Sequence, residues 1–461
     1  MEYFLDEVIW KRREVGYMSN VDVLVAGAGL SGLTLAREME SGGVNYRLVD
    51  TRKGPQDFKR AMYLISSVIA RQLSLGETCV EGEKPIVGYR EYDAATGRMV
   101  DGLGPILSGE IGFTPVSQYR IEKSLRSGEI GRNISWGTTV EGLVDSGSGV
   151  EVTTNRGNIR AKLVVDATGH SAAVTKMAGK REGDYLIRAL RGGSYPVTGH
   201  DPRVIHFVSG LERNEGNWMV PLGESGAEVM AGQVMPVSGA REWWDKYGQG
   251  ALENLVGWYE KKLGISISLP GNGGENMAFR VDPAPASQFK GGVVPFGEAA
   301  GLNSPIHGQL IDVLPLYAKT LADEIVRAKE RGEWMNVGKG FYRKFLTAPP
   351  FLYLIHRGFL ENRIRGGSRT GGVNRFIYKI LREEFDDFSL WRILQEGGLK
   401  LEDVVRLSIR RPREMTGFIV GSTPVLAHLL VTRPDLYVQF VASMPGRIAS
   451  LAKDRLGSSA V

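Results

Sequence analysis

Three glycines and one acid near the N-terminus have the spacing of a dinucleotide site. Gly27, Gly29 and Gly32 follow an apolar run at 21–26, and Asp50 ends a second apolar run. The first glycine of such a motif permits a sharp strand-to-helix turn, the second lets a pyrophosphate approach the backbone, and the third lets the helix pack on the sheet. The acid takes the ribose hydroxyls. We therefore expect the ADP part of a dinucleotide to be held by Gly27, Ala28, Gly29, Leu30, Ser31, Gly32, Asp50, Thr51 and Arg52.

A βαβ unit must position these residues. The run 21–26 alternates too little for a half-exposed strand, so it predicts a parallel strand covered on both faces. A helical stretch at 33–40, a turn at Gly42 and Gly43 and a second strand at 46–50 complete the unit. The alternative, a glycine-rich turn without a ligand, explains each part but not their order.

Two later segments have a similar strand-and-turn character: "LVVDATGHSAAV" at 163–174 and "GGVVPFGEAAGLNSPIHGQLIDVLPLYAKTLADEI" from 291 on. The three segments together resemble the FAD-binding domain of the glutathione-reductase-like flavoproteins. Within that group they are most similar to the branch of aromatic hydroxylases, lycopene cyclases and geranylgeranyl reductases. The resemblance implies FAD as the cofactor. It also implies an α/β fold, α+β overall, with a Rossmann domain, an inserted antiparallel substrate sheet and a helical C-terminal region.

By this resemblance the later segments supply further cofactor contacts. The residues implied are Asp166, Ala167, Thr168 and Gly169 beside the ADP half, and Gly297, Glu298, Gly301, Gly308, Gln309 and Leu310 toward the ribityl chain and flavin. Glu298 stands where the usual G-D-A-A-G pattern has aspartate, and Leu310 replaces the second glycine of P-x-x-G-x-G. In "VSQYRIEKSL", Gln118 stands where arginine is common. Gln118 is either a donor to a ribityl or phosphate oxygen or an ordinary exposed helix residue.

The positions of these motifs predict discontinuous domains. The FAD-binding domain is expected to comprise 18–75, 115–175 and 281–330, and the substrate or cap domain 76–114 and 176–280. Residues 331–461 are expected to form the helical region, because apolar residues recur there at three and four positions. Within the substrate domain we expect strands at 203–211 and 217–235, the latter a hairpin turning at 223–226.

The resemblance to geranylgeranyl reductases extends to the hairpin that begins with Trp218 and Pro221, and to "LKLEDVVRLSIRRPREM" near the C-terminus. It implies an FAD-dependent reductase that saturates carbon–carbon double bonds of isoprenoid chains, geranylgeranyl chains or lipids, with NAD(P)H or a reduced electron carrier as donor. Trp218 and Pro221 are the expected substrate residues, with plain core packing as the alternative for Trp218. His307 is the candidate proton donor because its reference pKa is near neutral. The alternative is that His307 caps a helix beginning at Gly308.

One departure from the family leaves other activities open. Geranylgeranyl reductases usually carry a Cys-Gly pair near the flavin, whereas "GPQDFKRAMYLISS" has no cysteine and offers Arg60 or Tyr63. The alternatives are an FAD-dependent monooxygenase, a lycopene-cyclase-like enzyme, and an electron-transfer flavoprotein without a small-molecule substrate.

Composition narrows the class of protein further. A formal charge of +5 over 461 residues does not indicate a nucleic-acid binder. The single cysteine, Cys79, excludes an internal disulfide and a cysteine-based metal cluster, and we expect no metal. Seven bases against one acid between 357 and 382 suit anionic lipid headgroups or a pyrophosphate, with a solvated basic face as the alternative.

The uncharged run at 415–432 predicts a buried or membrane-surface segment rather than a spanning helix. Residues 1–17 lack a secretion-signal core, and Met18 is an alternative start. We expect a cytoplasmic protein, with peripheral membrane contact left open.

Overall fold

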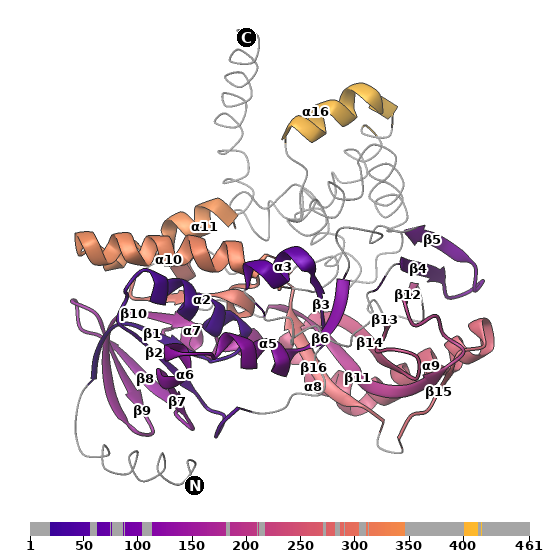
Figure 1. Ribbon diagram of the computed structural model, residues 1–461, viewed down its shortest axis with the longest axis horizontal. Coiled ribbons are helices and arrows are strands. Elements are labelled where there is room, and N and C mark those ends of the chain that lie inside the picture. Colours follow the sequence, from indigo (N-terminus) through magenta and orange to yellow (C-terminus); the bar gives the residue numbers. More distant parts are fainter. Residues whose placement is uncertain are drawn as a thin grey trace.

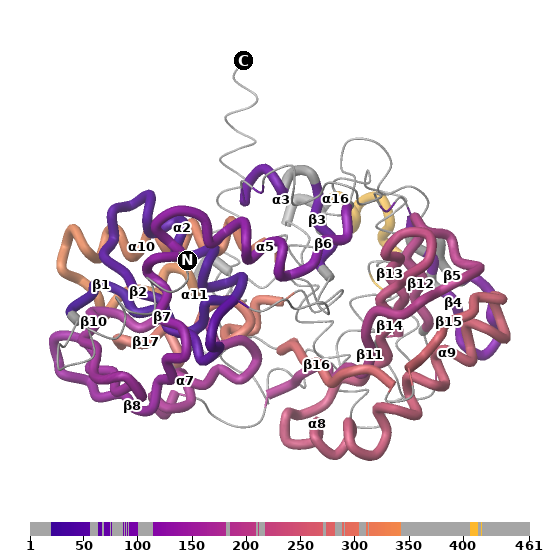
Figure 2. Tube along the Cα trace, turned by 60° about the horizontal axis from the view of Figure 1, so that its bottom comes forward, coloured from indigo at the N-terminus to yellow at the C-terminus, as the bar shows by residue number. Residues whose placement is uncertain are grey.

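The computed structural model describes residues 19–55, 62–73, 75, 86, 88–103, 113–180, 185–209, 211, 217–270, 273–281, 286–289, 291–303, 310–311, 313–345, 401–413 and 416. Two large β-sheets lie side by side, each with helices packed on it (Figure 1). A two-stranded ribbon lies between them, as the turned view in Figure 2 also shows.

The first sheet has seven strands and contains the predicted βαβ unit. Its order is β7-β2-β1-β10-β9-β8, and β17 pairs with the end of β10. Strands β7, β2, β1, β10 and β17 are parallel, whereas β9 is antiparallel to both of its neighbours. The bounds are β1 (Ser19–Ala26), α2 (Leu30–Ser41), β2 (Tyr46–Asp50), β7 (Ile134–Trp136), β8 (Val140–Asp145), β9 (Val150–Thr154), β10 (Gly157–Asp166) and β17 (Val293–Pro295). This arrangement is Rossmann-like.

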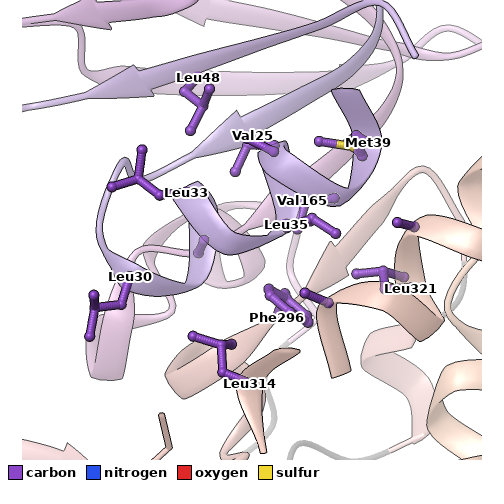
Figure 3. Packing of buried hydrophobic residues seen from close by; sticks show 14 of the residues in the cluster. Val25, Leu30, Leu33, Leu35, Met39, Leu48, Val165, Phe296, Leu314 and Leu321 are labelled. Carbon is purple, nitrogen blue, oxygen red and sulfur yellow. The ribbon is translucent and has the colours of Figure 1, made fainter. Parts of the chain in front are cut away.

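Both faces of β1 are buried, which accounts for its unbroken apolar run. Val23 and Val25 point into a core covered by α2 and α10 (Leu314–Arg331), while Leu24 and Ala26 point into a second core on the opposite face. Figure 3 shows part of the first core, with Val25, Leu30, Leu33, Leu35, Met39, Leu48, Val165, Phe296, Leu314 and Leu321. The predicted covered parallel strand at 21–26 is confirmed.

The second sheet has eight strands in the order β15-β11-β14-β13-β12-β4-β5, and β16 also pairs with β11. The bounds are β4 (Gly88–Asp93), β5 (Met99–Leu103), β11 (Leu186–Thr198), β12 (Val204–Ser209), β13 (Asn217–Pro221), β14 (Gly226–Pro236), β15 (Ser266–Ile267) and β16 (Glu275–Arg280). Helices α8 (Val237–Trp243) and α9 (Gln249–Leu263) pack against it, and α9 covers one face. The predicted strand at 203–211 and the hairpin turning at 223–226 are confirmed.

One strand pair differs from the expected antiparallel sheet. β12 and β4 are parallel, because β4 comes from an earlier segment and the chain passes through the first sheet before β12 forms. The ribbon between the sheets consists of β3 (Met62–Ser66) and β6 (Phe113–Ser117), which are antiparallel. β6 leads directly into α5 (Gln118–Leu125), which packs against α2.

The helix that was expected to begin at Gly308 begins later. α10 starts at Leu314, with Pro315 in its first turn, where the fixed φ of proline suits a helix start. The other helices are α3 (Ser67–Gln72), α6 (Glu129–Arg132), α7 (Ala173–Met177), α11 (Lys339–Phe345) and α16 (Leu401–Arg410). α11 and α16 match two of the helices predicted after 331, and the other predicted C-terminal helices lie outside the described residues.

Candidate functional site

The turn between β1 and α2 requires glycine at two of its three predicted positions. Gly27 has φ +107°, and a Cβ there would lie 2.3 Å from the Ala167 carbonyl oxygen. A Cβ at Gly32 would lie 1.9 Å from the Gly27 carbonyl oxygen. At Gly29 the nearest atom to such a Cβ is a carboxylate oxygen of Glu122, 3.8 Å away, so protein packing does not require glycine there. Free approach to this backbone is what a bound pyrophosphate needs.

Asp50 ends β2 beside this turn, and its carboxylate already accepts hydrogen bonds from other residues of the protein. The backbone N–H of Ala28 donates to Oδ2 at 2.7 Å. Arg52 donates three further bonds, each 2.9 Å long, from its backbone N–H, Nε and Nη2. Four donors use the acceptor capacity of a carboxylate. A ribose hydroxyl that binds Asp50 must therefore replace one of the bonds from Arg52.

Arg52 also bridges to Glu122 on α5. Its Nη1 lies 3.0 Å from Glu122 Oε2, and its Nη2 donates to the Ala28 carbonyl oxygen at 2.8 Å. The Glu122 side chain is fully buried, and Gln118 Nε2 donates to its Oε1 at 2.7 Å. Glu122 is a site residue that was not predicted from the sequence. The signal for it was its place in "QYRIEKSL", where R-x-x-F-D-x-x-L has the aspartate.

The turn after β10 is held by hydrogen bonds to the side chain of Asp166. This fully buried carboxylate accepts bonds from the Thr168 hydroxyl at 2.6 Å, the Thr168 N–H at 3.0 Å and the Thr175 N–H at 2.7 Å. Asp166 thereby fixes the loop whose residues Ala167 to Gly169 face the site.

Glu298 lies in the turn after β17, opposite the first glycine turn. A Cβ at Gly297, which has φ +63°, would lie 2.0 Å from Ser31 Oγ, so the two turns are in close contact. The Glu298 side chain is 24% exposed, and His170 Nδ1 lies 3.9 Å from its Oε1. Burial raises the pKa of Glu298 to about 7, against the opposing effect of the backbone N–H and charge of Arg280.

Arg280 ends β16 and joins the second sheet to the turns of the first. Its backbone N–H donates to Glu298 Oε1 at 3.2 Å, and its Nη1 donates to the Ala299 carbonyl oxygen at 2.9 Å. The guanidinium, which is 2% exposed, lies 4.6 Å from the ring centre of Tyr185. The Tyr185 hydroxyl donates in turn to the carbonyl oxygen of His170. Nothing in the sequence indicated Arg280, because its contacts come from distant segments.

These groups surround one cavity of about 480 Å³. Its wall includes Gly27, Gly29, Leu30, Ser31, Asp50, Thr51, Arg52, Tyr63, Gln118, Glu122, Ala167, Thr168, Gly169, Glu298, Asn303, Leu310 and Leu314. The donor set fits a dinucleotide cofactor, because bare backbone at a helix start, an acid at the end of β2 and hydroxyl-binding carboxylates share one wall. When bound, such a cofactor would be held by the two glycine turns, the Asp50–Arg52 pair and Glu298.

Most of the predicted site residues meet at this cavity. The predicted residues that line it are Gly27, Gly29, Leu30, Ser31, Asp50, Thr51, Arg52, Gln118, Ala167, Thr168, Gly169, Glu298 and Leu310. Those that do not are Ala28, Gly32, Asp166, Gly297 and Gly301, which belong to the turns that form its wall. His307, Gly308, Gln309 and Arg60 lie outside the described residues. The binding roles of all these residues stay predictions.

The two predicted substrate residues lie on opposite faces of β13. Met219 belongs to the core under α9, so strand alternation places Pro221 on that covered face and Trp218 on the other. Trp218 pairs across the strands with Met230, and Val220 pairs with Glu228. We call the face of the second sheet that is opposite α9, with Trp218, Val220, Glu228 and Met230, the open face; Trp218 is half-buried, and the other three residues are at most 9% exposed. Neither Trp218 nor Pro221 lines the cavity.

Within the described ranges, no group of His, Cys, Asp and Glu side chains is arranged to hold a metal ion. In the same part of the chain, none of the helices combines the length and apolarity needed to cross a membrane. The basic segment 357–382, Cys79 and residues 1–17 lie outside the described residues, as does nearly all of 415–432.

Comparison with known proteins agrees with this geometry. A family model described as an FAD binding domain matches residues 20–309, which is more than half of the chain. No curated protein matches the sequence significantly. The solved structures described next share less than 25% sequence identity with this chain, so they show a likeness of fold alone.

One similar structure is a geranylgeranyl bacteriochlorophyll reductase-like protein from Thermoplasma acidophilum, with TM-score 0.61, 18% identity, and coverage of 87% of this chain and 98% of that one. A flavin-dependent brominase has TM-score 0.58, 15% identity, and coverage of 82% and 94%. The p-nitrophenol 4-monooxygenase of Pseudomonas putida has TM-score 0.52, 15% identity, and coverage of 91% and 99%. The expected Rossmann-type FAD-binding fold and its FAD cofactor are confirmed.

Proposed function

The chain belongs to the FAD-binding-domain family, and from this premise we propose that it is an FAD-dependent reductase of carbon–carbon double bonds in isoprenoid chains, geranylgeranyl chains or lipids. We also propose the domain division given above, NAD(P)H or a reduced carrier as electron donor, and a cytoplasmic location with peripheral membrane contact through 357–382. The first solved structure described above supports this choice by its likeness of fold.

The observation that carries the proposal is a cofactor cavity linked through Arg280 to a second sheet that has apolar side chains on its open face. Trp218 and Met230 lie together on that face, and Val220 follows on the same side of β13. Apolar side chains of this kind suit the wall of a site for a long apolar substrate, whose own burial is worth about 25 cal/mol for each Å² of its apolar area removed from water.

The chain's own residues perform binding, orientation and proton handling. FAD, when bound, supplies the two-electron chemistry. The backbone at Gly29 and the start of α2 hold the pyrophosphate, and Asp50 with Arg52 holds the ribose. Glu298 faces the cavity and exchanges a proton near pH 7. His307 remains our predicted donor of the proton that completes saturation of the double bond.

A monooxygenase is the second candidate, because the p-nitrophenol monooxygenase shares the fold over 91% of this chain. In that case the same cavity holds FAD, and the open face binds a smaller aromatic substrate. A lycopene-cyclase-like enzyme and an electron carrier without a small-molecule substrate are further outcomes of the test below.

The deciding experiment mixes purified, chemically reduced protein with geranylgeranyl diphosphate without oxygen. Return of the yellow oxidised-flavin absorbance, with a product heavier by two hydrogens for each double bond, is the expected result. Reoxidation only by oxygen, with an oxygenated product from an aromatic probe such as p-nitrophenol, identifies a monooxygenase instead. A cyclised product of unchanged mass identifies a cyclase, and no response to either probe favours the electron carrier.

The proton donor is tested with His307→Asn. We expect slower reoxidation by the lipid, by about 10²-fold, with FAD still bound. Wild-type turnover would remove His307 from the mechanism.

A further inference from the structure

Tyr63 lies on β3, in the ribbon between the two large sheets (Figures 1 and 2). Its pairing with Val116 of β6 fixes the strand, and its ring packs against the core that α2 and α10 cover. Tyr63 also lines the cavity, where it is the one aromatic side chain among the described lining residues. The ribbon therefore holds a phenol in the cofactor wall.

Three carboxylates from different elements act on the Tyr63 hydroxyl. Burial is the largest cause that raises its pKa well above the ordinary value of about 10, and the negative charges of Glu298, Glu122 and Glu228 raise it further. The hydroxyl therefore keeps its proton through the physiological range and is available as a hydrogen-bond donor.

The ribbon locates the hydroxyl. Tyr63 lines the cofactor cavity together with Glu298 and Glu122. The β3–β6 ribbon that carries it lies between the two large sheets, so Tyr63 belongs to the side of the cavity that faces the second sheet (Figures 1 and 2).

The redox ring of a bound cofactor is expected on the side of the cavity toward the second sheet. Asp50 and the first glycine turn are at the AMP half of a dinucleotide, so the flavin half extends away from them. On the basis of the proposed function, we infer that Tyr63 is a catalytic residue whose hydroxyl donates a hydrogen bond at the reacting end of the bound cofactor, between its ring and the substrate. A fixed donor there stabilises the negative charge that the ring gains on reduction.

The first test is the midpoint potential of bound FAD in Tyr63→Phe. This change keeps the ring and removes the donor, so we expect FAD content to stay at the wild-type level. The reduced cofactor should lose about tenfold in binding relative to the oxidised one, which corresponds to a potential about 30 mV more negative. Tyr342→Phe is the matched control, because Tyr342 belongs to the same core but does not line the cavity. Equal potentials in Tyr63→Phe and wild type would overturn the inference.

The second test measures reoxidation of the reduced proteins by geranylgeranyl diphosphate without oxygen. Tyr63→Phe should react at least tenfold more slowly than wild type and Tyr342→Phe, by analogy with the loss of other fixed donors. Wild-type speed in Tyr63→Phe would overturn the catalytic role. If the lipid reoxidises none of the proteins, the proposed function fails, while the potential of Tyr63→Phe still decides whether this hydroxyl acts on the cofactor.

Discussion

Glu298 is a partly buried carboxyl group, 24% exposed, in contact with a buried arginine and close to a histidine. Burial raises its pKa from 4.5 to about 7, while the Arg280 N–H and charge act in the opposite direction. Burial, with the charge of Lys176 as the second cause, lowers the pKa of His170. The folded protein therefore binds a proton at Glu298 in a pH range where the unfolded chain has released it.

This difference predicts the pH dependence of stability. Between about pH 4.5 and pH 7 the folded state holds more protons at this site, so the free energy of unfolding falls as the pH rises, by at most about 3 kcal/mol because the side chain is 24% exposed. The contribution of the protonated group is complete below pH 4.5 and is lost by the time the pH passes the folded pKa.

Urea unfolding of the FAD-free protein from pH 5 to pH 8 measures this fall. Glu298→Gln should flatten the curve, whereas Glu242→Gln, which changes an exposed carboxyl on α8, should leave it as in wild type. Parallel curves for Glu298→Gln and wild type would contradict the raised pKa.

At the scale of elements, Arg52 connects the end of β2 to α5 and to the turn before α2. Its guanidinium, 15% exposed, lies between the carboxylates of Asp50 and Glu122, which are 8% and 0% exposed. A buried carboxylate that loses its cation costs far more than an exposed one, because water cannot replace the partner.

We therefore expect Arg52→Met to lower the free energy of unfolding of the FAD-free protein by about 3–5 kcal/mol. Glu122→Gln alone should cost less, and the double variant should cost less than the sum, with a coupling energy of about 0.5–3 kcal/mol. Denaturant titration of the four proteins gives the cycle. Lys246→Met, in an exposed ion pair on the second sheet's helices, should change stability little. Strict additivity would show that the bridge does not couple β2 to α5.

At the scale of the whole molecule, one buried guanidinium joins the second sheet to the turns Gly169–Ser171 and Gly297–Ala300. Arg280 contacts the turn at Glu298 and Ala299, and through Tyr185 it reaches the turn at His170. A contact of this kind raises the free energy of local opening in the segments that it joins.

Arg280→Lys keeps the charge but loses the planar guanidinium that stacks on Tyr185 and bonds Ala299. We expect a loss of about 2 kcal/mol in the free energy of local opening, which makes amide hydrogen exchange about thirtyfold faster in both turns, Gly169–Ser171 and Gly297–Ala300. Exchange in the hairpin turn near Gly223 should not change.

Arg191→Lys is the matched control, because Arg191 lies on the same strand pair and bonds Gly273 and Asn276 instead. If only one of the two turns exchanges faster in Arg280→Lys, the contact does not join them.

The sequence by itself determined the βαβ unit, the glycine turn and the acid at the end of β2. These features depend on local steric needs, because Gly27 has a φ of +107° and a Cβ at Gly32 would lie 1.9 Å from the carbonyl oxygen of Gly27. The FAD-binding fold followed from the order of three such motifs.

Only the tertiary structure decided which other groups meet them. Glu122, Arg280 and Tyr63 reach the site from α5, β16 and the β3–β6 ribbon, and the parallel pairing of β12 with β4 joins segments more than a hundred residues apart. Pro221 and Trp218 lie on opposite faces of β13, because successive side chains of a strand point to alternate faces of the sheet. Contacts of this kind form between segments that are far apart in the sequence, and the raised pKa values result from burial between those segments. A local pattern of residues therefore cannot predict them.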